Sequence, residues 1–256
     1  MYPNILHIYG PLYVNSYGTA IFIALIVFIV LATKDSRLKK VTSPEKFINI
    51  VIYGTLVGII GGRLLDIFNN LNNYSFYECI AIWEPGYSLL GSVISITLFL
   101  VWYLKKEKIQ TLKFLDIVGT YAPLLQSISR VGCFFAGCCY GRETAVPWAI
   151  IYTHPDVASA LKFVPIHPSQ LYSSAILFLI FILMKNLTSK IKTPGILFFV
   201  YLMLLSVERF TVDFFRADQE FYSSKLLSIL SIHQWISVLI FNTALLSALY
   251  LKNRHR

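Results

Sequence analysis

Charged residues are scarce in this chain of 256 residues. Asp, Glu, Lys and Arg together make up 14% of the sequence, whereas hydrophobic residues make up 56%. A soluble globular domain has about 25% charged residues. The mean hydropathy of +0.65 points the same way. The composition therefore excludes an ordinary soluble domain and predicts an integral membrane protein.

Acidic residues are the scarcer charge type, 13 against 22 basic residues, and the net charge is +9. Fifteen of the basic residues form four groups that flank apolar segments. Anionic lipid at the cytoplasmic membrane surface accounts for such groups, so nucleic-acid binding is the weaker interpretation of the charge. The groups are Lys34, Arg37, Lys39, Lys40 and Lys46; Lys105, Lys106, Lys108 and Lys113; Lys185, Lys190 and Lys192; Lys252, Arg254 and Arg256.

Seven apolar segments alternate with these groups, and each is close to the ~20 residues that a helix needs to cross a bilayer. The positive-inside rule places all four basic groups in the cytoplasm. We therefore expect an all-α integral membrane protein with seven transmembrane helices, the N-terminus outside and the C-terminus cytoplasmic. The predicted spans are Tyr17–Thr33, Phe47–Asp66, Ser88–Leu104, Phe114–Ser129, His167–Met184, Gly195–Phe215 and Ser231–Leu251.

The sequence also lacks repeats and low-complexity tracts, so residues 1–256 are predicted to form a single membrane domain. Met1–Ser16 has neither a basic segment nor a small-residue cleavage site, which favours an arm at the outer interface over a cleaved signal peptide. The longest outer connection, Arg130–Ile166, is apolar and punctuated by glycines. A connection of this length is usually functional when it is not disordered.

Cysteine is rare as well, with four residues in the chain. Three of them, Cys133, Cys138 and Cys139, lie in this long connection. Their spacing lacks the second pair typical of zinc sites, so a metal is the least favoured interpretation. A disulfide on the outer face and a set of small, buried, inert thiols are equally open alternatives.

Arginine is costly at membrane depth and is usually kept there to hold an anion. Arg209, Asp213 and Arg216 stand at i, i+4 and i+7 and share one helix face, which favours a ligand site over a structural ion-pair network. For Arg63 a snorkelling side chain is an equally good interpretation. Glycines near Arg130 predict an unusual backbone whose N–H groups cradle a phosphate.

All four arginines are predicted at the outer ends of spans two, four and six. His167, Gln170 and Tyr172 open span five from the same side, although a lone histidine is more often a structural hydrogen-bonding residue. A pocket with an arginine rim and an apolar floor suits a phospholipid.

The motifs resemble those of the prolipoprotein diacylglyceryl transferases, bacterial inner-membrane enzymes with seven spans. The resemblance covers nearly the whole chain. It is carried by Gly10-Pro11 with Tyr17-Gly18, Gly61-Gly62-Arg63, Trp83 through Gly91, Asp116, Arg130-Val131-Gly132, Gly141-Arg142, His167-Pro168-Ser169-Gln170-Leu171-Tyr172, and Arg209 with Asp213-Phe214-Phe215-Arg216.

The resemblance implies transfer of the diacylglyceryl group of phosphatidylglycerol to the lipobox cysteine of a lipoprotein precursor, with release of glycerol phosphate. No cofactor is expected. The cysteine spacing argues against a metal, the charge pattern argues against nucleic acid, and the predicted topology places the active site towards the outer leaflet. Arg130 and Arg209 take the catalytic positions. The expected substrate-binding residues are Tyr17, Arg63, Gly132, Gly141, His167, Gln170, Tyr172, Asp213 and Arg216.

The chain departs from the family pattern at three positions. Leu90 stands where the family commonly has a histidine, Cys133 replaces an asparagine, and Cys138 replaces an acid near Gly141. His167 or a water molecule is then the candidate base, and a thiolate favoured by the arginines is the alternative. A transferase with another acceptor and a non-catalytic phospholipid-binding or transport protein remain open alternatives.

Overall fold

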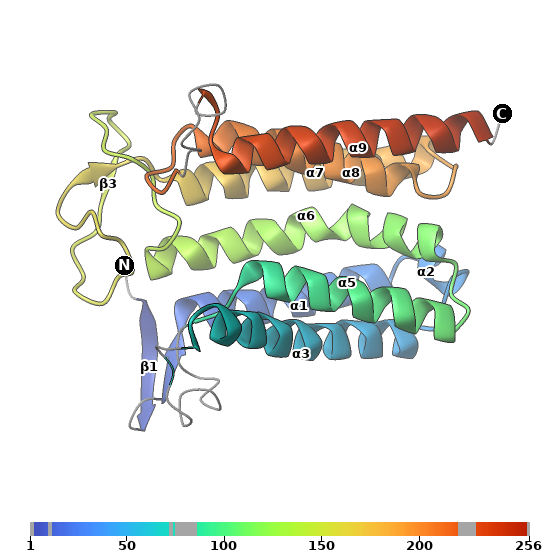
Figure 1. Ribbon diagram of the computed structural model, residues 1–256, viewed down its shortest axis with the longest axis horizontal. Coiled ribbons are helices and arrows are strands. Elements are labelled where there is room, and N and C mark those ends of the chain that lie inside the picture. The colour runs from blue at the N-terminus through green and yellow to red at the C-terminus, as the bar shows by residue number, and fades with distance from the viewer. Residues whose placement is uncertain (1–2, 10–11, 72–73, 75–85, 220–228, 255–256) are drawn as a thin grey trace. The chain divides into compact units, whose positions relative to one another are not determined.

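The computed structural model describes residues 3–9, 12–71, 74, 86–219 and 229–254. The motif residues Gly10, Pro11 and Trp83 lie outside these ranges. Seven long helices form most of the described chain (Figure 1). They are α1 Ser16–Thr33, α3 Pro44–Asn69, α5 Leu89–Lys106, α6 Thr111–Ala136, α7 Ser169–Lys190, α8 Ile196–Asp213 and α9 Ile232–Arg254, and the short helix α2 spans Ser36–Lys39.

Each predicted span falls on one of these long helices, so the expectation of a helical protein is confirmed. Five helices, α1, α3, α5, α7 and α9, are long and apolar enough to cross a membrane. Helix α8 contains three charged residues, Glu208, Arg209 and Asp213, which lower its hydropathy. The chain is a mostly helical, multi-pass membrane protein.

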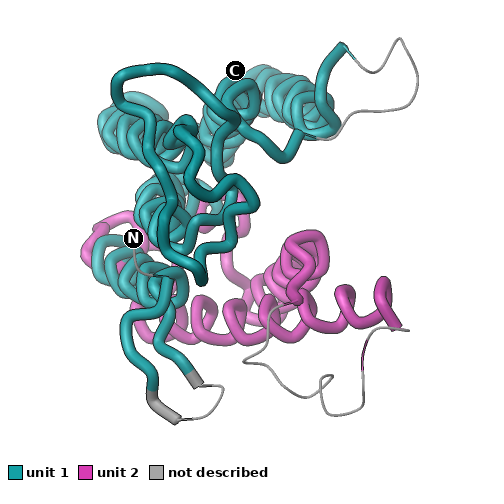
Figure 2. Tube along the Cα trace, turned by 90° about the vertical axis from the view of Figure 1, so that its left-hand side faces the viewer, with its two compact units in different colours: residues 1–9, 13–32, 115–256 teal, residues 10–12, 33–114 magenta. Residues whose placement is uncertain are grey.

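The chain divides into two compact units (Figure 2). Helices α1, α6, α7, α8 and α9 belong to unit 1, and helices α2, α3 and α5 belong to unit 2. Unit 1 comprises Met1–Tyr9, Tyr13–Ala32 and Leu115–Arg256, and unit 2 comprises Gly10–Leu12 and Thr33–Phe114.

Unit 2 is built on two helices that pack closely through small residues. Ser43 caps α3 by accepting a hydrogen bond from the Lys46 backbone N–H at 3.2 Å. Further along, a side chain at Gly61 would collide with Ser95 of α5. The Ser92 hydroxyl donates to the Gly58 carbonyl oxygen at 2.8 Å. Small residues let two helix backbones approach in this way within a membrane.

In unit 1, helix α7 packs against α8, and α8 packs against α9. The buried residues between α7 and α8 are apolar, with Leu177 and Met184 facing Leu197 and Tyr201. Serine side chains add polar contacts between helices, because the Ser127 hydroxyl of α6 donates to the Ser174 carbonyl oxygen of α7 at 2.8 Å.

Asp116 of α6 fixes the start of α8. Its carboxylate accepts hydrogen bonds from the backbone N–H groups of Gly195, at 2.7 Å, and Phe198, at 2.9 Å. The first N–H groups of a helix have no partner within the helix, and a carboxylate also suits the positive end of the helix dipole. The far end of α8, which carries Arg209, is therefore positioned from α6.

The end of α6 differs from the prediction. The helix continues beyond Ser129 to Ala136 and stops where Gly137 adopts a φ of +74°. Arg130 and Gly132 are thus helical, so the backbone N–H cradle expected beside Arg130 is wrong. The helix already uses those N–H groups for its own hydrogen bonds.

The connection after α6 has a small core of its own. Strands β3, Ile150–Ile151, and β4, Pro165–Ile166, pair antiparallel. Tyr152, Val157 and Ile166 are buried together beneath them. The predicted N-terminal arm also forms a two-stranded sheet from β1, Asn4–Tyr9, and β2, Leu12–Asn15. These short strands were not predicted from the sequence.

Candidate functional site

Backbone hydrogen bonds bring the end of α8, the long connection and the start of α7 together. The Arg142 N–H donates to the Phe215 carbonyl oxygen at 2.9 Å, and the His167 N–H donates to the Arg142 carbonyl oxygen at 3.0 Å. Gly141 pairs with Arg216 in a β-bridge. A side chain at Gly141 would collide with backbone atoms of His167 and Phe215. Gly141 thus allows the three segments to meet.

Three of the predicted arginines gather around this junction. Arg130 comes from α6, Arg209 from the last turns of α8, and Arg216 from just beyond α8. The charges of Arg130 and Arg216 act on the Arg209 guanidinium, so the three groups are electrostatic neighbours. We call these residues the arginine cluster. Three like charges in one place favour an anionic ligand.

The members of the arginine cluster differ in how their charges are compensated. Arg216 binds Asp218 through two hydrogen bonds, with Nε to Oδ1 at 2.8 Å and a second nitrogen to Oδ2 at 2.5 Å. Burial opposes ionisation of Asp218, but the hydrogen bonds and charge of Arg216 outweigh it and lower the pKa of this carboxyl. The predicted grouping of Arg216 with Asp213 is therefore replaced by a pair with Asp218.

Arg209 lies 3.8 Å from Asp213, at the limit of an ion pair. Asp213 is 1% exposed, and its carboxylate accepts a hydrogen bond from the Ser231 hydroxyl. Arg130 makes no hydrogen bond or ion pair with any residue that the structure describes. Arg130, together with the weakly paired Arg209, is therefore the part of the arginine cluster that is available to bind an anionic ligand.

An apolar cavity of about 750 Å³ opens beside α6. Its lining comes mainly from α1, α6 and α7, and Ser127 on this lining is one helical turn before Arg130. Residues three apart are neighbours on a helix surface. The wall residues are Asn4, Ile5, Ser16, Thr19, Ala20, Ile23, Leu124, Ser127, Ile128, Val131, Phe135 and Phe178.

Tyr17 and Gly132 lie where α1 crosses α6. A Cβ atom at Gly132 would come within 2.6 Å of the Ala20 Cβ atom and 3.3 Å of the Tyr17 Cα atom. Gly132 therefore permits the close approach of the two helices. Tyr17 lies within electrostatic range of Arg130 and of Cys133.

The Gln170 side chain is buried at this junction, with 1% of its surface exposed. Its amide nitrogen donates to the Cys138 carbonyl oxygen at 2.7 Å and to the Tyr152 hydroxyl at 3.2 Å. Its amide oxygen is buried and accepts no hydrogen bond from any described residue. A buried acceptor without a donor is costly, so a hydrogen-bonding ligand is favoured at this atom.

His167 and Tyr172 belong to a hydrogen-bonded chain with Trp148. The indole N–H of Trp148 donates to the Tyr172 hydroxyl at 2.6 Å, and that hydroxyl lies 3.2 Å from Nδ1 of His167. Burial, with a smaller contribution from the charge of Arg142, lowers the pKa of His167. A neutral imidazole whose Nδ1 accepts a hydrogen bond from the Tyr172 hydroxyl fits both this contact and the lowered pKa.

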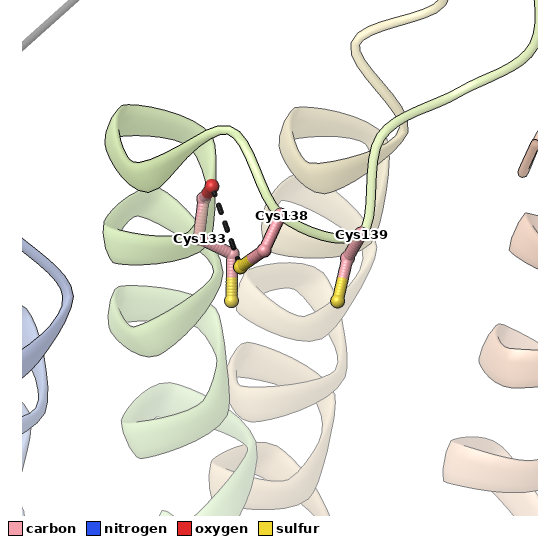
Figure 3. A group of neighbouring side chains, drawn as sticks. All are labelled: Cys133, Cys138 and Cys139. Atoms are coloured by element: carbon pink, nitrogen blue, oxygen red, sulfur yellow. Dashed lines mark hydrogen bonds between the residues drawn. The ribbon is translucent and has the colours of Figure 1, made fainter. Parts of the chain in front are cut away.

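The three cysteines of the long connection converge at the end of α6 (Figure 3). All three sulfur atoms lie within 4.8 Å of one another, and all three residues are free thiols. We call Cys133, Cys138 and Cys139 the thiol triad. Among the alternatives that the sequence left open, the structure thus gives free thiols in place of a disulfide.

Arg63 belongs to unit 2. It is 4% exposed and donates to the Gly86 carbonyl oxygen at 2.9 Å. Its guanidinium carbon lies 4.9 Å from the ring centre of Tyr74 and 5.6 Å from that of Tyr87. These contacts show a firmly held side chain and not a snorkelling one.

The structure adds site residues that sequence analysis missed. Glu208 is buried and accepts a hydrogen bond from the Ser173 hydroxyl. It stands directly before Arg209 inside an apolar segment, and a charged residue in such a segment indicates a functional site. Asp218 lies only two residues after Arg216, but outside the apolar run, so it did not stand out. Tyr152 carried no signal, because only the folded connection brings it to Gln170.

The fold and this site define a multi-pass helical membrane protein with an arginine cluster beside an apolar cavity, a combination that suits a phospholipid ligand. Comparison with known proteins then identifies the family. The family model described as prolipoprotein diacylglyceryl transferase matches residues 3–250. The chain belongs to this enzyme family, and the resemblance seen in the sequence is confirmed.

Several named relatives cover most of the chain. A phosphatidylglycerol–prolipoprotein diacylglyceryl transferase of Clostridium tetani is 31% identical over 93% of this chain and 93% of its own length. A protein of the same name from Nitrosospira multiformis is 30% identical over 90% of this chain and 79% of its own length. One from Thermotoga maritima is 30% identical over 79% of this chain and 70% of its own length.

Proposed function

We propose that this enzyme transfers the diacylglyceryl group of phosphatidylglycerol to the lipobox cysteine thiol of a lipoprotein precursor and releases glycerol phosphate. The observation that carries the proposal is the placement of Arg130. Its guanidinium makes no hydrogen bond or ion pair with any described residue, and it lies one helical turn from Ser127 on the wall of the apolar cavity. A lipid phosphate at Arg130 would leave its acyl chains beside that wall.

The reaction requires an attack by sulfur on a glycerol carbon. The new C–S bond forms as the C–O bond to the phosphate breaks, and the leaving glycerol phosphate gains one negative charge. Donors aimed at a developing charge give the largest catalytic contribution in many enzymes. Arg130 and Arg209 are the catalytic residues in this proposal, because the charge of Arg216 is already balanced by Asp218.

The other site residues bind or position the substrates. Gln170 offers its buried amide oxygen to a hydroxyl group of the donor headgroup. Asp213 orients Arg209, and Tyr17 and Gly132 shape the contact of α1 with α6. The remaining positions on the substrate side are Arg63, Gly141, His167, Tyr172 and Arg216.

All seven long helices cross the membrane in this proposal, with the N-terminus outside and the C-terminus cytoplasmic. The four basic groups support this direction by the positive-inside rule. The enzyme then resides in the bacterial cytoplasmic membrane with its active site towards the outer leaflet. Its partners are phosphatidylglycerol and a lipoprotein precursor.

The test uses purified enzyme, phosphatidylglycerol labelled in its headgroup glycerol, and a lipobox peptide. We expect glycerol phosphate release and a peptide whose mass increases by one diacylglyceryl group, and no product from a peptide with alanine in place of cysteine. Release of glycerol phosphate without peptide modification, beyond the rate of hydrolysis, would show a different acceptor. Binding of phosphatidylglycerol without release would show a non-catalytic lipid-binding protein.

A further inference from the structure

The thiol triad is a second feature of the site, which the proposed arginine chemistry does not use. Cys133 stands in the last turn of α6 and is buried, whereas Cys138 and Cys139 follow the turn at Gly137 and are half-buried. The Cys138 sulfur lies 3.8 Å from the Cys133 carbonyl oxygen (Figure 3). The turn therefore folds back and places two thiols against the helix end.

The backbone of this turn adopts an uncommon conformation. Cys139 has a φ of +56°, in the left-handed region that residues with a side chain rarely adopt. This conformation costs on the order of 1–2 kcal/mol, and such costs cluster at functional sites. A buried, inert cysteine packs like any small apolar residue, so its packing does not require this strained backbone conformation.

The geometry points to a metal site: we propose that Cys133, Cys138 and Cys139 bind one thiophilic divalent ion of the zinc class. A sulfur-only set of ligands selects such an ion against magnesium or calcium. Zinc–sulfur bonds of about 2.3 Å in a tetrahedron place the sulfurs about 3.8 Å apart. The three sulfur atoms already lie within 4.8 Å of one another, so small side-chain movements bring them into range.

Neighbouring charges suit the complex. Three thiolates and a divalent ion carry one net negative charge. Arg216 lies within electrostatic range of Cys139, and Arg130 lies within electrostatic range of Cys133 and Cys139. Because Asp218 already balances the charge of Arg216, Arg130 is the arginine that offsets the negative charge of the complex.

Three protein ligands leave one position of a tetrahedral zinc ion open, as catalytic zinc sites do. Under the proposed function, the acceptor cysteine takes this position and loses its proton to water, since a coordinating thiol is deprotonated. Its sulfur lone pair then forms the C–S bond, and the electrons of the breaking C–O bond leave with glycerol phosphate. Arg130, which would hold the donor phosphate, lies within electrostatic range of Cys133 and Cys139. The metal site thus deepens the proposed function and specifies how the acceptor is bound.

Metal binding is tested without turnover. The purified full-length protein is stripped with a chelator, reduced, and titrated with Co²⁺ as a coloured probe. We expect one Co²⁺ per chain with sulfur-to-cobalt charge-transfer absorption, and loss of that absorption in Cys133→Ser and in Cys138→Ser. Cys79→Ser is the matched control, because it removes a thiol outside the triad, and it should keep the absorption. Absorption that is absent from the reduced wild type, or unchanged in both triad variants, overturns the metal site.

The acceptor role is tested by transfer rates. A free thiol with a pKa of about 8.5 is about 3% ionised at pH 7, so removal of the metal should slow transfer by about 10–30-fold there and much less at pH 9. Zn²⁺ should restore the rate. Arg130→Lys should still bind Co²⁺ while transfer falls by about 10²–10³-fold, which separates failure of the metal site from failure of the proposed function. Unchanged transfer after verified metal removal overturns the acceptor role.

Discussion

At the scale of single residues, the arginines differ by their partners more than by their positions. Arg216 is held by two hydrogen bonds to Asp218, whereas Arg209 is 3.8 Å from Asp213. Arg130 has no such partner among the described residues. The order of expected catalytic importance is therefore Arg130, then Arg209, then Arg216.

The lowered pKa of His167 predicts how the transfer rate depends on pH. Because its pKa is lowered, the imidazole stays neutral to a lower pH than free histidine, whose pKa is about 6.5. If His167 is the base, transfer falls as the pH drops through this lowered pKa, so the midpoint of the acid limb lies below about 6.5. The pH–rate profile of His167→Gln should then lack that limb.

The alternative for His167 is purely structural. In that case His167→Gln keeps the wild-type rate and the same acid limb, and thiol ionisation depends on the arginines or on the thiol triad. His154→Gln is the matched control, since His154 lies elsewhere in the same connection, where its Nδ1 accepts a hydrogen bond from the Asp156 N–H at 3.2 Å.

The arginines were predictable from the sequence because a charge inside an apolar run is rare and stands out. Their partners were not predicted. Ser231 approaches Asp213 only through the folding of the segment after α8. Asp218 is only two residues from Arg216, but the helical spacing of Arg209, Asp213 and Arg216 pointed to Asp213 instead. The thiol triad was missed for a similar reason. A Cys-x4-Cys-Cys spacing does not reveal that the turn at Gly137 returns to the helix end.

At the scale of helices, the sequence predicted the position of each long helix, but it placed the end of α6 too early, at Ser129. Long apolar runs bounded by lysines mark the helices, whereas the end of α6 depends on Gly137 and on the packing of the connection behind it. Ser129 looked like the membrane edge because Arg130 follows it. The helix instead runs on to Ala136, and Gly132 lies in this extra stretch, where it allows the close approach of α1.

Gly132→Ala tests this close contact. The new methyl group would lie 2.6 Å from the Ala20 Cβ atom, so α1 and α6 must separate. Overpacking of this kind costs about 1–3 kcal/mol, which should lower the thermal midpoint in detergent and reduce transfer.

Gly54→Ala is the matched control for this change. Gly54 is also helical, but its added methyl group would lie 3.7 Å from Phe99, an ordinary contact. Alanine is favoured over glycine in a helix by about 1 kcal/mol, so this variant should be as stable as the wild type or more so. Equal effects of the two substitutions would show that the α1–α6 contact is not tight.

At the scale of the whole molecule, the four basic groups make a prediction about membrane sides. Lys39→Cys, in the first basic group, should react with a membrane-impermeant thiol reagent only after the cells are opened. Asp156→Cys, in the long connection, should react in intact cells. Labelling is measured against the parent protein, which has cysteines of its own. Reaction of both sites from the same side contradicts the topology and the outward-facing active site.

The most direct test of the central claim is the steady-state kinetics of Arg130→Lys. Lysine keeps the charge and loses the planar, forked donor, so the donor lipid should still bind while the leaving phosphate is poorly stabilised. We predict that kcat falls by about 10²–10³-fold with a much smaller change in KM for phosphatidylglycerol. Arg254→Lys, the same change at the exposed end of α9, should keep the wild-type kcat. A wild-type kcat in well-folded Arg130→Lys would contradict the account.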